Sequence, residues 1–132
     1  MTITTNSTYV QPAWAPPQQT AQIGYGANQV GTMGATYTYL NCELGSQFSV
    51  AFVRGNSGST IEAINPQPGQ SIAIFLKQDA TTGSGTVAWD SWLWHSGSAP
   101  TLSTTVGTTD VILGTWNDTL AKWVGSSILA IS

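Results

Sequence analysis

His95 is the only histidine of the 132-residue chain, and it lies among Asp90, Ser91, Ser96 and Ser98. These residue types are those of a Ser-His-Asp triad, in which a histidine base activates a serine nucleophile. No serine occupies a Gly-x-Ser-x-Gly turn that would expose such a nucleophile. A serine-rich chain also contains serine, histidine and aspartate close together in sequence by chance. We therefore interpret His95 as a loop residue and expect no catalytic triad.

Carboxyl groups are the next candidates, because glycoside hydrolysis needs two of them on either side of the sugar. Asp90 and Asp118 could form such a pair, but acids in loops are more simply explained as turn formers and solvated charges. Metal binding has little basis in the sequence, since Cys42 is the single cysteine and no Asp-x-Asp-x-Asp-Gly loop occurs. We expect a protein that is not an enzyme and holds no metal or cofactor.

The third candidates are the tryptophans. Five of the six follow residue 88, namely Trp89, Trp92, Trp94, Trp116 and Trp123. Side chains two residues apart share one face of a strand, so the rings of Trp92 and Trp94 should lie together. Exposed rings can stack on sugars, but aromatic residues also dominate cores and subunit interfaces, and we favour these locations. The residues that we nominate for an inter-subunit or glycan-facing surface are Trp92, Trp94, His95 and Trp116.

The elements that must position these residues are strands. Between residues 35 and 132 the apolar runs are short, β-branched or aromatic, separated by turn-forming residues, and without helical periodicity. The run at 71–76 is apolar on both faces, which predicts a central strand covered on both sides. We predict consecutive antiparallel strands over 35–132, in an all-β antiparallel sandwich or jelly-roll-like barrel of about seven or eight strands.

Residues 1–34 differ from this domain. They contain three prolines and four glycines and keep no regular period, which predicts an extended N-terminal arm. Such an arm could reach on the order of 100 Å at about 3.3 Å per residue. It either binds a partner surface or is a tail that stays disordered or folds back. The apolar anchors that we nominate for partner contact are Tyr9, Val10, Trp14, Ile23 and Tyr25.

The composition restricts the possible partners. Only 7% of the residues are charged, and the three basic ones, Arg54, Lys77 and Lys122, are scattered. Nucleic acids and anionic membranes both require clustered cations, so we expect neither as a partner. No apolar run is long enough for a membrane span, and the N-terminus lacks the features of a secretory signal. A surface with so little charge favours a permanent partner or self-association.

Part of the sequence resembles a known family, and the most specific part of the pattern is Ala-Pro-Thr-Leu-Ser-Thr-Thr at 99–105, followed by Asp110-Val111. The other matching residues within 36–132 are Gly69-Gln70-Ser71, Gln78-Asp79, Gly85-Thr86-Val87-Ala88-Trp89, Trp94, Gly97 and Trp123. Together they resemble a β-domain of tailed-phage virion proteins, which occurs at the ends of tail fibres and in small head proteins.

A short arm in place of a fibre stalk makes the chain most similar to a capsid decoration, or cement, protein. The resemblance implies a homotrimer, made in the host cytoplasm, on the outer surface of the capsid. It would bind the major capsid protein through its arm and stabilise the head. The alternative is a tail-fibre or tail-tip protein whose tryptophan loops bind host surface glycan. A third hypothesis is a small glycan hydrolase that uses Asp90 or Asp118.

Overall fold

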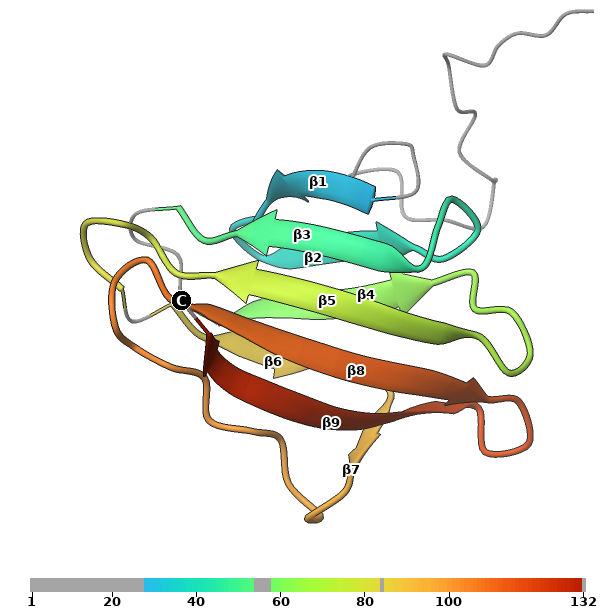
Figure 1. Ribbon diagram of the computed structural model, residues 1–132. Helices are drawn as coiled ribbons and strands as arrows, with labels where there is room; N and C mark the ends of the chain where they lie inside the picture. The colour runs from blue at the N-terminus through green and yellow to red at the C-terminus, as the bar shows by residue number, and fades with distance from the viewer. Residues whose placement is uncertain (1–27, 54–57, 84, 132) are drawn as a thin grey trace, which may run out of the picture.

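The computed structural model describes residues 28–53, 58–83 and 85–131, and all regular secondary structure within them is β-strand (Figure 1). The expected all-β class is therefore confirmed. These residues form nine strands rather than seven or eight. They are β1 (Asn28–Thr32), β2 (Tyr37–Asn41), β3 (Gln47–Ala51), β4 (Ser59–Ile64), β5 (Ser71–Lys77), β6 (Val87–Trp89), β7 (Trp92–Trp94), β8 (Thr109–Asn117) and β9 (Lys122–Ile131). The described residues include no helix that is long and apolar enough to span a membrane.

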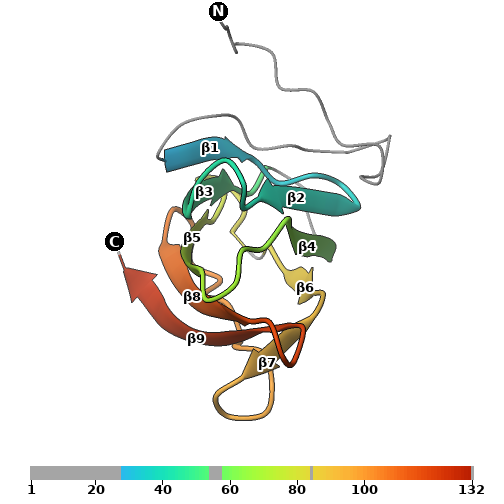
Figure 2. The same ribbon diagram turned by 90° about the vertical axis from the view of Figure 1, so that its right-hand side faces the viewer.

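The described strands lie in two sheets, and from β1 to β7 the chain alternates between them. The larger sheet has the order β1-β3-β5-β8-β9-β7, and the smaller has the order β2-β4-β6. β1, β3 and β5 pair in parallel in the larger sheet, and β2, β4 and β6 pair in parallel in the smaller one. From β1 to β6 the chain therefore winds in successive turns, each with one strand in each sheet. Figure 2 shows these turns from one end.

This topology corrects the expectation of consecutive antiparallel strands. Among the described strands that follow one another in sequence, only β8 and β9 pair, and they do so antiparallel. The strand β5 is also antiparallel to β8, whereas β7 is parallel to β9. Apolar alternation shows which side chains of a strand face the core, but half-buried parallel and antiparallel strands share the same period of two. The pattern therefore could not specify the neighbour of each strand.

The core lies between the two sheets. Leu40 and Ile61 come from the smaller sheet and Phe48, Ile74 and Ile112 from the larger one, and all five are completely buried. β5 is central, as expected, but its burial alternates along the strand, with Ile72, Ile74 and Leu76 facing the core. Its other side chains lie on the opposite side of the sheet, so the expected cover on both faces is wrong for the described residues.

The segment assigned to the arm contains part of the sheet. Residues 28–32 form β1 and pair with β3 over five residues. This strand has a single large apolar side chain, Val30, and main-chain hydrogen bonds to β3 hold it in the sheet. Its sequence therefore shows no apolar alternation that would indicate a strand. The boundary at residue 34 is therefore wrong by at least one strand. The five proposed anchors of the arm lie outside the described residues.

Two buried polar side chains fix the loops on one side of the sheets. The Gln78 side chain donates to the carbonyls of Gly85 and Ser103, both at 2.9 Å, and accepts the Gly85 N–H at 2.7 Å. The Asp110 carboxylate accepts the N–H and hydroxyl of Ser103 and the N–H of Ala130, each at 2.7 Å. These bonds satisfy both buried groups and connect three segments that are distant in sequence.

Candidate functional site

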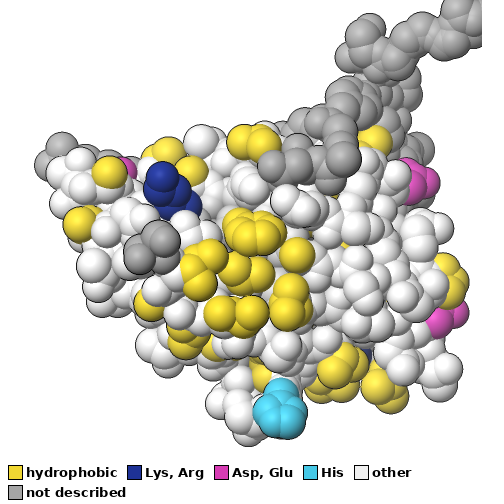
Figure 3. All heavy atoms as spheres, viewed as in Figure 1, with side chains coloured by type: hydrophobic (Ala, Val, Ile, Leu, Met, Phe, Trp, Pro, Cys, Tyr) yellow, Lys and Arg dark blue, Asp and Glu magenta, His cyan; other side chains and the backbone are white. Residues whose placement is uncertain are grey.

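The side of the larger sheet that points away from the core, called the outer face below, is rich in apolar residues. Pairing aligns Val30, Ser49, Phe75, Val111 and Ile128 in one row across five strands. Figure 3 shows apolar side chains gathered in the middle of this face, over β5, β8 and β9. Exposed apolar patches of this kind are typical of binding surfaces.

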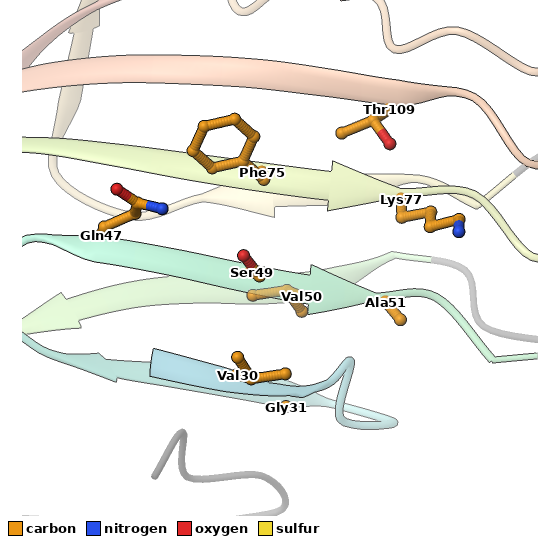
Figure 4. A pocket seen from close by; sticks show the side chains of 9 residues that line it. All are labelled: Val30, Gly31, Gln47, Ser49, Val50, Ala51, Phe75, Lys77 and Thr109. Atoms are coloured by element: carbon orange, nitrogen blue, oxygen red, sulfur yellow. The ribbon is translucent and has the colours of Figure 1, made fainter. Parts of the chain in front are cut away.

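A groove of about 440 Å³ crosses the outer face near β1, β3 and β5 (Figure 4). It arises because β3 carries the small side chains Ser49 and Ala51, while its neighbours carry Val30 and Phe75. Among the described residues, Lys77 is the only charged one that lines it. The groove is therefore mainly apolar, with the Lys77 ammonium group at its lining, and could bind an aliphatic or aromatic side chain of a partner.

The tryptophans cluster at the side of the core next to β7. The Trp92 ring stacks on Trp94, with centroids 5.1 Å apart, and on Trp123, with centroids 5.7 Å apart. The expected shared face of Trp92 and Trp94 is thus confirmed. Trp89 contacts both rings at a steep angle, with centroids 5.1 Å away in each case. Trp92 and Trp123 are buried, so these two rings belong to the core.

Two glycines make room for the stacked rings. A Cβ added at Gly114 would lie 2.5 Å from the Trp92 ring, and one added at Gly125 would lie 2.7 Å from Trp92 and 2.8 Å from Trp94. The rings therefore pack directly on the main chain of β8 and β9. The buried indole N–H of Trp92 has no hydrogen-bond partner in the part of the chain that the structure describes.

The other nominated residues are more accessible. Trp94 is half-buried and His95 is exposed, and both line a second, smaller hollow of about 190 Å³ together with Ser96, Ser98 and Pro100. An aromatic ring beside several hydroxyls has the chemistry of a sugar site. Trp116 is also half-buried, but it packs against Trp123, and its indole N–H donates to Asp118 at 3.2 Å. It does not line this hollow.

Asp90 and Asp118, the two acids considered for glycoside hydrolysis, have different partners in the structure. Asp90 forms a hydrogen bond with Glu62, whereas Asp118 accepts a hydrogen bond from the indole N–H of Trp116. Burial raises the pKa of Glu62, and the charge and hydrogen bond of Asp90 raise it further. Two carboxyl groups this close retain a proton more readily than either alone. The described residues contain no group of three or more His, Cys, Asp or Glu side chains that could hold a metal ion.

The groove is the feature that sequence reasoning missed. Its lining comes from four strands, and its small residues on β3 are ordinary strand residues in the sequence. Only the parallel order of β1, β3 and β5 places them between larger side chains. No family model, curated protein or solved structure matches this chain.

Proposed function

We propose that this chain is a phage capsid decoration protein that binds the outer surface of the major capsid protein shell and stabilises the head. The observation that supports the proposal best is the apolar outer face with its groove, on a chain in which only 7% of the residues are charged. A protein of this kind needs broad contact surfaces rather than a reactive centre. The resemblance of residues 36–132 to phage virion domains points in the same direction.

The proposed assembly is a homotrimer, and the two sheets of each copy form a rigid, sandwich-like body. Its N-terminal arms grip neighbouring shell subunits through Tyr9, Val10, Trp14, Ile23 and Tyr25. Each arm contact is weak by itself, but three linked arms on a symmetric lattice bind together at a high effective concentration. This multiplication gives tight attachment without a deep binding site.

The test is co-sedimentation with expanded phage heads that carry no decoration protein. A chain that begins at Asn28 is the appropriate truncation, because it removes 27 residues and keeps β1. We expect saturable binding of the full chain and binding at least about tenfold weaker for the truncated chain, a loss of about 1.4 kcal/mol or more. Absence of binding by the full chain would refute the proposal. Equal binding by both chains would refute the role of the arm.

A tail-fibre or tail-tip protein that binds host surface glycan is the second candidate. The small hollow beside Trp94, His95 and the serines favours it, because ring stacking and hydroxyl hydrogen bonds together recognise sugars. Labelled protein should then stain host cells, and Trp94→Ala should abolish staining while Leu120→Ala leaves it unchanged. Staining of isolated capsids but not of cells would exclude this candidate.

A further inference from the structure

The outer face of the larger sheet exposes large apolar side chains on several neighbouring strands. Val30, Leu113 and Ile128 keep 64%, 40% and 53% of their surface accessible, and the half-buried Phe75 lies on the same face of β5. Figure 3 shows that these apolar side chains gather in the middle of the face. An apolar region of this kind on a flat sheet is normally covered by a second protein surface.

Polar residues border this apolar region at both ends of the central strands. Ser71 pairs with Thr115 at one end of β5 and β8, and their hydroxyl oxygens are 3.1 Å apart. Lys77 pairs with Thr109 at the other end. An apolar centre with a polar rim is the usual composition of a protein–protein interface. The outer face as a whole, rather than the groove alone, therefore has the composition of an interface.

The area of the whole face is sufficient for a stable dimer. The larger sheet has six strands, and its longest, β8 and β9, have 9 and 10 residues. Six strands about 4.8 Å apart, with an average of about six and a half residues at about 3.3 Å each, give a flat footprint of roughly 600 Å². Projecting side chains raise the accessible area above this footprint, towards the roughly 800 Å² per partner of a standard interface.

The register of the sheet makes the outer face complementary to itself. The row defined above runs through Val30, Ser49, Phe75, Val111 and Ile128, on β1, β3, β5, β8 and β9 in that order. A two-fold axis parallel to the strands, between β5 and β8, reverses this order in a second copy. Ile128 of the second copy then lies opposite Ser49, which is the low point of the groove between Val30 and Phe75 (Figure 4). The projecting side chain meets the groove twice, once in each copy.

The adjacent row of the sheet follows the same rule. Leu113 is paired with Ala73 of β5 on one side and with Ser126 of β9 on the other. The same two-fold axis places Leu113 opposite Ala73 of the second copy, so a large side chain again meets a small one. At the end of the face it places Lys77 opposite Thr109, and the ammonium group stays in water at the rim.

We propose that the outer face binds the outer face of a second copy of this chain, so that the free protein is a two-fold symmetric dimer. The contact is isologous, because both copies use the same surface, and the two sheets pack face to face. This inference goes beyond the proposed function. It concerns the free protein and requires neither phage heads nor the trimer proposed on the shell.

The first test is the mass of the full chain in analytical ultracentrifugation without phage heads. We expect twice 13.9 kDa for the natural chain. Ile128→Glu places an unpaired carboxylate in the partner groove and should weaken the dimer at least about a hundredfold, because an uncompensated buried charge is costly. Leu120→Glu is the matched control, since Leu120 is 54% exposed on the β8–β9 turn and should leave the mass unchanged. Near-UV circular dichroism establishes that each variant is folded.

The second test pairs opposite charges across the interface. Ser49→Arg should also give a monomer by itself. An equimolar mixture of Ser49→Arg and Ile128→Glu should form a dimer of one copy each, because one contact becomes an arginine–glutamate pair and the other stays natural. A mixture that remains monomeric would overturn the proposed register.

The mass of the natural chain decides between this dimer and other assemblies. A chain that is monomeric at every concentration would overturn the inference, even if it binds phage heads. A trimer in solution would overturn the two-fold contact and would agree with the assembly proposed on the shell. A dimer that fails to bind phage heads would support the contact and refute the proposed function.

Discussion

Gly125→Ala tests how the tryptophan cluster is held. The new methyl group would lie 2.7 Å from Trp92 and 2.8 Å from Trp94, closer than carbon atoms pack. Trp92 cannot withdraw easily, because Trp94, Trp89 and Trp123 surround it with centroids 5.1, 5.1 and 5.7 Å away. Gly125 is not among the glycines with positive φ, so the effect of alanine is steric rather than conformational.

The expected loss follows from these contacts. Overpacking a core typically costs about 1–3 kcal/mol, and each displaced aromatic pair contributes about 0.5–1.5 kcal/mol. We therefore expect Gly125→Ala to lower the free energy of unfolding by about 2–4 kcal/mol. For a domain of this size that corresponds to a fall in Tm of at least about 8 °C.

The assay is urea unfolding followed by tryptophan fluorescence, with near-UV circular dichroism to report the packing of the rings. Ser126→Ala is the matched control, since Ser126 is the next residue of β9 and its side chain is exposed. We expect the control to stay within about 0.5 kcal/mol of the natural chain. If Gly125→Ala also stays within that range and keeps its near-UV spectrum, the steric argument is wrong.

Three further predictions concern buried polar and ionisable groups. Asp110→Asn should lower the free energy of unfolding by about 2–4 kcal/mol in urea melts, because an amide cannot accept all three bonds that the carboxylate accepts; a loss below about 0.5 kcal/mol would contradict this. The raised pKa of Glu62 means that the folded state binds the Glu62 proton more tightly than the unfolded state does. The protonated Glu62 carboxyl therefore stabilises the fold at pH below the usual glutamate pKa, and this stabilisation is lost as pH rises through the raised pKa. Glu62→Gln should therefore flatten the dependence of Tm on pH across this range and raise Tm at neutral pH, and an unchanged profile would show that the carboxyl pair is not responsible. Burial raises the pKa of the Cys42 thiol to about 12, so a maleimide at pH 7.5 should label it only after unfolding; rapid labelling of the native chain would refute its burial.

Several local features could be predicted from the sequence. Alternation along residues 47–53 predicts that Phe48, Val50 and Phe52 share one face, and all three are buried in the core. Trp92 and Trp94 were expected to share a face, and their rings stack. These predictions succeed because the direction of a side chain along a strand depends only on the local backbone.

The pairing of strands could not be predicted in the same way. β1 has one large apolar residue and is held by main-chain bonds to β3, so its sequence reads as part of an arm. The parallel neighbours β3 and β5 are separated in sequence by a strand of the other sheet. Parallel pairing depends on long-range packing, which no local pattern records.

The sequence alone determined that the chain is all-β within the described residues, that Trp92 and Trp94 share one face, and that little charge is available for binding. The tertiary structure alone decided which surfaces are left for partners. Val30, Ser49 and Phe75 lie far apart in the chain and form the groove only through the register of β1, β3 and β5. A binding surface on a sheet is a property of neighbouring strands, and neighbours are chosen by the packing of the whole chain.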